Sequence, residues 1–79
     1  MTTFNSAAAT AIKATATGAT SAGVVSIPGL AIGDLLLVVD PPGFAQGFEE
    51  VVSVANQIQQ TANLDWSTVD FTFYLLRGV

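Results

Sequence analysis

The side chains that could do chemistry in this chain are few. It has no histidine and no cysteine, which removes Ser-His-Asp triads, thiolate nucleophiles and His-bearing metal sites. What remains is acid–base work by a carboxylate pair, or a calcium site built from carboxylates and loop carbonyls. The acids available for either are Asp34, Asp40, Glu49, Glu50, Asp65 and Asp70.

The spacing of these acids argues against both kinds of site. Asp34 and Asp40 bracket an expected strand and would stand about 20 Å apart, too far for the pair that hydrolyses glycosides. Glu49 and Glu50 are adjacent in another expected strand, so they would point to opposite faces. There is no Asp-x-Asp-x-Asp loop for calcium, and the glycines match no nucleotide-binding fingerprint. We therefore expect no enzyme, no metal and no cofactor.

Charge and hydropathy exclude two further classes of partner. The net charge is −4 and the only cations are Lys13 and Arg77, whereas nucleic-acid binding needs clustered Lys and Arg. The longest apolar stretch, Leu30–Val39, is interrupted by Gly33 and Asp34 and falls well short of the ~20 residues that span a membrane. The first residues show no secretory signal, so we expect synthesis in a cytoplasm.

The elements that would position these residues are short strands. An Ala/Thr-rich tract opens the chain, and we expect an extended arm over residues 1–10 and a strand around Ala11–Thr17. A helix over Ser6–Ala14 is the alternative. Pro and Gly turns then separate further strands, which are Gly23–Ile27, Leu35–Val39, Phe48–Ala55 and Val69–Leu76, with Asn56–Thr61 as an extension or a separate strand.

This pattern predicts an all-β fold. About six short strands at regular spacing favour a small sandwich or barrel, with residues 1–79 as a single β domain and residues 11–79 as its β core. In the closing strand, Val69, Phe71, Phe73 and Leu75 would face the core, leaving Asp70, Thr72, Tyr74 and Leu76 on the other face. In the fourth strand, Val52 and Val54 would share a face.

Two of the expected strands carry more apolar residues than one small core needs. Leu35–Val39 does not alternate at all, and Tyr74-Leu75-Leu76 is apolar on both sides, which predicts burial of both faces. A 79-residue chain without disulfides or zinc usually gains stability by oligomerisation. We therefore expect another protein chain to cover the second face.

The candidates for this interface are the large apolar side chains outside the expected core. Trp66 lies in an expected loop, where it could be a lid over one end of the core, an interface anchor or a sugar-stacking platform. Phe4 would anchor the arm from Thr2 to Thr17, which could add a strand to a neighbour's sheet edge. The interface candidates are Phe4, Leu36, Val38, Trp66, Tyr74 and Leu76.

The run GVVSIPGLAIGDLLLVV (residues 23–39), taken with the closing strand Val69–Leu76, resembles small virion structural proteins of tailed bacteriophages, notably capsid decoration (cement) proteins. The resemblance implies a β-rich fold, homo-oligomers such as trimers bound to the major capsid protein on the capsid exterior, an arm reaching neighbouring subunits and no catalytic residues. Tail and fibre components look similar. A small carbohydrate- or surface-binding module using Trp66 and Tyr74 is the alternative from another class.

Overall fold

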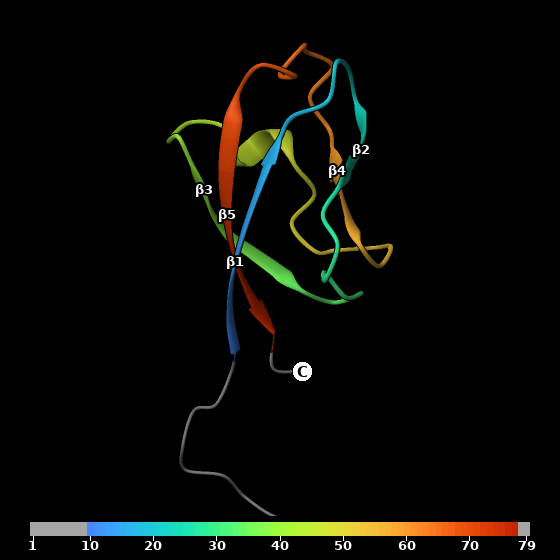
Figure 1. Ribbon diagram of the computed structural model, residues 1–79, viewed down its shortest axis with the longest axis vertical. Coiled ribbons are helices and arrows are strands. Elements are labelled where there is room, and N and C mark those ends of the chain that lie inside the picture. Colours follow the sequence, from blue (N-terminus) through green and yellow to red (C-terminus); the bar gives the residue numbers. More distant parts are fainter. Residues whose placement is uncertain (1–9, 78–79) are drawn as a thin grey trace, which may run out of the picture.

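The computed structural model describes residues 10–77, which form two antiparallel sheets (Figure 1). The first has the strand order β1-β5-β3 and the second pairs β2 with β4. The all-β fold expected from the sequence is confirmed. The strands are β1 (Thr10–Thr17), β2 (Gly23–Ser26), β3 (Leu35–Asp40), β4 (Gln57–Gln60) and β5 (Asp70–Arg77), and a short 3-10 helix, η1 (Ala45–Gly47), follows β3.

Strand β1 settles the conformation of the described part of the Ala/Thr tract. It pairs with β5 along its whole length, so the helical alternative is wrong for residues 10–14. Its side chains alternate between half-buried Ile12, Ala14 and Ala16 and an exposed row that includes Thr15 and Thr17. β-branched threonine suits such a pleated surface. Phe4, with the rest of residues 1–9, lies outside the described residues.

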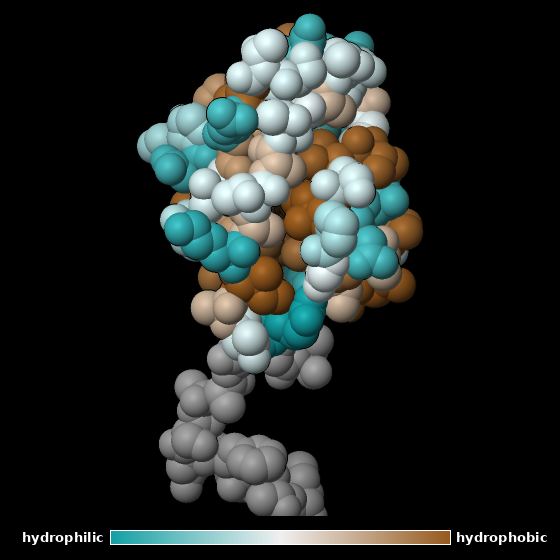
Figure 2. Space-filling view, in the orientation of Figure 1, coloured by the Kyte–Doolittle hydropathy of each residue, from teal (hydrophilic) through white to brown (hydrophobic). Residues whose placement is uncertain are grey.

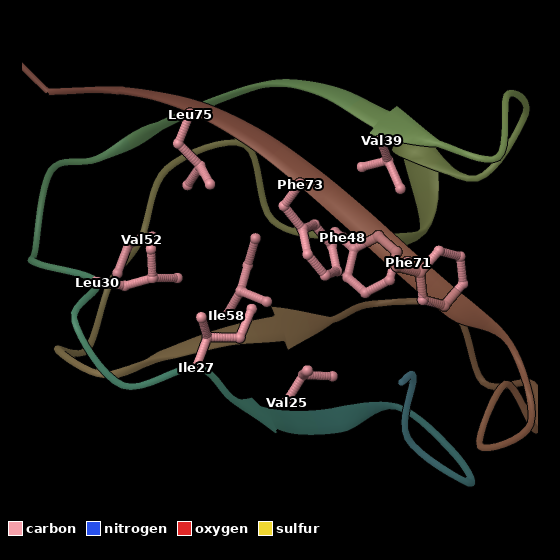
Figure 3. Close-up of a cluster of buried hydrophobic side chains, with 10 residues drawn as sticks. All are labelled: Val25, Ile27, Leu30, Val39, Phe48, Val52, Ile58, Phe71, Phe73 and Leu75. Atoms are coloured by element: carbon pink, nitrogen blue, oxygen red, sulfur yellow. The ribbon is translucent and has the colours of Figure 1, made fainter. Parts of the chain in front are cut away.

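The hydrophobic core lies between the two sheets (Figure 3). As predicted, Phe71, Phe73 and Leu75 of β5 point inward, and each is at most 1% exposed. Phe48 packs edge-on against two of them, with ring centroids 4.9 Å from Phe73 and 5.2 Å from Phe71. The buried apolar side chains are Val25, Ile27, Leu30, Val39, Phe48, Val52, Ile58, Phe71, Phe73 and Leu75.

The chain by itself buries Leu35–Val39 on one face only, and whether another chain covers the second face stays a prediction. Only Val39 is buried, while Leu37 and Val38 are 52% and 53% exposed. A β-bulge explains the distribution, because the pairing with β5 shifts between Leu36 and Val38 and leaves Leu37 without a partner. The bulge turns Leu36 and Val39 toward the core, and Leu35 and Val38 away from it.

The prediction of a regular strand over Phe48–Ala55 is wrong, because this part of the chain forms only isolated bridges at Phe48 and Val51. The segment 48–52 is extended but irregular, because it bonds to two different sheets in succession. Glu49 N–H donates to Gln59 O of β4 (2.9 Å), whereas Leu36 N–H of β3 donates to Glu50 O (2.8 Å). A chain that changes partners within two residues must bend. In consequence Val52 is buried and Val54 is 49% exposed, so these two do not share a face.

The segment 48–52 joins the two sheets into a partly open barrel. Isolated bridges link Leu35 with Val51 on one side and Phe48 with Gln60 on the other. Strand β4 then begins after Asn56, whose φ of 65° bends the chain, so Asn56–Thr61 contains a separate strand. The order around the barrel is β1-β5-β3, the segment 48–52, β4 and β2.

Candidate functional site

The carboxylates form no metal-binding cluster in the part of the chain that the structure describes. No group of three or more acids gathers between residues 10 and 77 that could hold a metal ion. Within the same range, no helix is long and apolar enough to cross a membrane.

Asp34 is a buried acid with a structural partner. It is 1% exposed, and Arg77 at the end of β5 donates from Nε to Oδ1 (2.8 Å) and from Nη2 to Oδ2 (2.6 Å). These hydrogen bonds hold the pKa of Asp34 below its ordinary value of 3.8, against the opposing effect of burial; the Ala31 N–H adds to the lowering. The Asp34 carboxylate in turn raises the pKa of Arg77. Arg77 also donates to Gly29 O (2.8 Å), so the pair fixes the end of β5 to the loop before β3.

Gln60 is the second buried polar side chain, and its amide ties two loops together. Its Oε1 accepts from Ala19 N–H (2.8 Å), and its Nε2 donates to the carbonyls of Ala62 and Leu64 (both 2.9 Å). The side chain is 1% exposed, and no buried side-chain nitrogen or oxygen between residues 10 and 77 lacks a partner. Nothing in the sequence pattern distinguishes Gln60 from Gln57 or Gln59.

Trp66 closes one end of the core, in the position of the lid considered above. Its ring lies 5.0 Å from that of Phe44 and 5.6 Å from that of Phe48. A Cβ on Gly47 would collide with the indole ring, and a Cβ on Gly18 would collide with the Trp66 backbone. The two glycines are therefore required by the close approach of Trp66.

The outer face of the three-stranded sheet carries a cluster of apolar side chains from different strands. Directly paired residues share a face, and the pairs here are Leu35 with Leu76, Val38 with Tyr74, and Leu35 with Val51. Four of the five are between 39% and 53% exposed, and Leu76 is half-buried. We call this set the outer patch; it consists of Leu35, Val38, Val51, Tyr74 and Leu76.

Apart from Ala11, which pairs with Leu76, the rest of this face is polar. Lys13 pairs with Tyr74 at the border of the outer patch, and beyond it Thr15, Thr72 and Asp40 lie level with one another across the three strands. The face therefore has an apolar end, near the start of β3, and a hydroxyl-rich, acidic end. In the view of Figure 2, apolar surface emerges between hydrophilic side chains over both sheets. Only contiguous apolar surface, such as the outer patch, indicates contact with another molecule.

The structure brings together three of the interface candidates, Val38, Tyr74 and Leu76. Leu36 instead packs against the core, Trp66 covers the core's end, and Phe4 lies outside the described residues. The sequence analysis missed Leu35 and Val51. The unbroken apolar run of β3 was a signal for Leu35. No signal identified Val51, because its position depends on the bent segment 48–52.

Comparisons with known proteins do not assign the chain to a family. No family model matches it, and neither a curated protein nor a solved structure matches it.

Proposed function

We propose that this protein is a non-enzymatic structural protein that docks through its outer patch on a repeating protein surface, and that this surface is a bacteriophage capsid. The observation that supports docking is the outer patch itself. It gathers exposed aliphatic and aromatic side chains from β3, β5 and the segment 48–52 on one face. The capsid, and the role of a decoration or cement protein on its exterior, come from the sequence resemblance.

The geometry favours a protein partner over other ligands. The outer patch lies on a sheet face, and Lys13 is the single cation beside it. A flat apolar surface with a polar border is typical of a protein–protein contact. A contact of five side chains is small beside the 20–30 residues per side of a standard interface, so a capsid would hold the protein through many equivalent contacts.

Two valine variants test the docking surface. Val38 and Val24 lie in strands and are both 53% exposed, but only Val38 belongs to the outer patch. Purified Val38→Lys, Val24→Lys and wild-type protein are each mixed with capsids of the phage that encodes the chain. Bound copies per particle are then counted after gradient centrifugation. We expect the wild type and Val24→Lys to bind, and Val38→Lys to lose at least about tenfold in affinity because a charge replaces buried apolar contact.

Each outcome bears on a different part of the proposal. Equal binding by the two variants would exclude the outer patch as the docking surface. Absence of wild-type binding to capsids, with binding to tails or fibres of the same particle, would move the protein to that location on the virion. Both variants must first give wild-type thermal unfolding, since the substituted side chains are half exposed in the free protein.

A further inference from the structure

The edge of β3 that faces away from β5 is open over most of its length. At its start, Leu36 N–H donates to Glu50 O (2.8 Å) and Leu35 bridges to Val51. From Leu37 to Asp40, no backbone group on this side has a hydrogen-bond partner among residues 10–77. Unpaired sheet edges accept additional strands.

A groove of about 470 Å³ meets this open edge at its first residue, Leu37. Leu35 and Leu37 line it from β3, and Ala45 and Phe48 line it from the loop that carries η1. Gln46 and Glu50 supply its polar groups. A groove with apolar side chains next to free backbone groups fits an extended segment that pairs with the edge and inserts one large side chain.

Residues 1–9 of this chain have the composition that such a site requires. Their sequence, MTTFNSAAA, has one aromatic residue, Phe4, among mostly small side chains, and it carries no acidic side chain to be repelled by Glu50. Nine residues before Thr10 reach about 30 Å when extended. About five of them could lie beside Leu37–Asp40, and the others could bridge to β1.

We propose that residues 1–9 of one copy add a strand to the open edge of β3 in a second copy, with Phe4 in the groove beside Leu37 and Phe48. The strand directions favour a second copy over the same chain. β1 and β3 both run antiparallel to β5, and Thr10 lies level with the start of β3. To reach its own β3 edge, the segment would have to reverse direction, pass β5 and β3, and go around the segment 48–52, which is bonded to Leu35 and Leu36. This self-association is independent of whether the outer patch binds a capsid.

Cysteine cross-linking in solution tests this pairing without any capsid. The chain has no cysteine of its own, so single cysteines can be introduced next to Phe4 and at the groove. With oxidised glutathione as the oxidant, a Thr3→Cys chain is mixed with a Gln46→Cys chain, and in parallel with a Ser26→Cys chain as a control on β2. Both target positions are exposed. We expect the disulfide-linked pair with Gln46→Cys to form at least about tenfold faster than the control pair, because docking raises the local thiol concentration.

Two further variants make the result decisive. Adding Phe4→Ser to the Thr3→Cys chain should reduce its rate with Gln46→Cys to that of the control. Equal rates for the two pairs, or a fast rate that survives Phe4→Ser, would overturn the proposal. A Thr3→Cys/Gln46→Cys double variant that closes within one chain, at a rate independent of protein concentration, would overturn the second copy as the partner.

Discussion

At the scale of single residues, the two buried polar side chains do different work. Asp34 and Arg77 connect the end of β5 to the turn before β3, so they hold Leu76 and Leu35 level with each other in the outer patch. Gln60 connects the loops after β1 and β4 at the other end of the barrel. The hydrophobic pattern of the sequence does not predict the burial of Asp34 or of Gln60.

Replacing Gln60 with leucine should destabilise the protein, although an apolar side chain would ordinarily suit a buried position. Ala19 N–H and the carbonyls of Ala62 and Leu64 would lose their partners in a site without water access, at a cost of at least about 2 kcal/mol. Gln59→Leu is the matched control, because this neighbouring side chain is only half-buried and should change the free energy of unfolding by less than about 0.5 kcal/mol. Urea unfolding measures both, and equal effects would contradict the proposed role of Gln60.

Acid should weaken the fold through Asp34. Because its pKa is lowered in the folded state, the unfolded chain binds a proton more readily, and this contribution to stability is complete above the ordinary value of 3.8. It is lost as the pH falls through the folded-state pKa. We expect the free energy of unfolding to decline below about pH 4, and Asp34→Asn to be less stable at pH 7 with a shallower decline. Urea titrations at a series of pH values from 7 to 2.5 measure the free energy of unfolding of both proteins. If it declines with falling pH as steeply in Asp34→Asn as in the wild type, other acids cause the decline.

At the scale of elements, the sequence predicts a strand well where the alternation of apolar and polar residues marks one face. Alternation in β5 correctly placed Phe71, Phe73 and Leu75 in the core, and β5 pairs with β1 along its whole length without a register shift. The five successive apolar residues of β3 do not alternate with polar ones, so the sequence did not show which of them face the core. The bulge at Leu37 decides which of them turn inward, and its position depends on the pairing with β5, which is not encoded in β3 alone.

Because of the bulge, we expect substitutions at two neighbouring leucines to have unequal effects on the free energy of unfolding. Leu36→Thr should destabilise by about 1–2 kcal/mol because this side chain packs against the core. Leu37→Thr should stay within about 0.5 kcal/mol of the wild type, since its side chain is 52% exposed. A regular strand without the bulge would give Leu37 the same facing as Val39 and reverse the order of the two effects. Thermal unfolding of the two variants therefore tests the bulge.

The segment 48–52 shows a second limit of local pattern. Its residues have the composition of a strand, and their backbone groups are satisfied as a strand's would be, but by β4 first and by β3 afterwards. That change of partner depends on where β3 and β4 lie in the fold, which the sequence of residues 48–52 does not determine. It places Val51 beside Leu35, and so the membership of the outer patch could be predicted only in part.

At the scale of the whole molecule, the surplus of apolar residues stays at the surface of the free chain. Leu35, Leu37 and Val38 are all at least 40% exposed, so the sequence correctly indicated an excess, although the chain does not bury it within its own fold. Exposed apolar strand edges invite uncontrolled association. The proposed contacts would cover them in two ways, with the capsid on the outer patch and residues 1–9 of another copy beside Leu37.

If the protein binds capsids as proposed, the response of that binding to salt distinguishes an apolar contact from a charged one. The protein has a net charge of −4 and only Lys13 beside the outer patch, so screening should change the affinity by less than about threefold between 0.1 and 0.5 M NaCl. Ammonium sulfate should strengthen binding, because sulfate favours burial of apolar surface. Occupancy per particle at fixed protein concentration measures both effects. A steep loss of occupancy in NaCl would show that ion pairs dominate, and the docking face would then be sought at the acidic end of the sheet, around Asp40 and Asp70, in place of the outer patch.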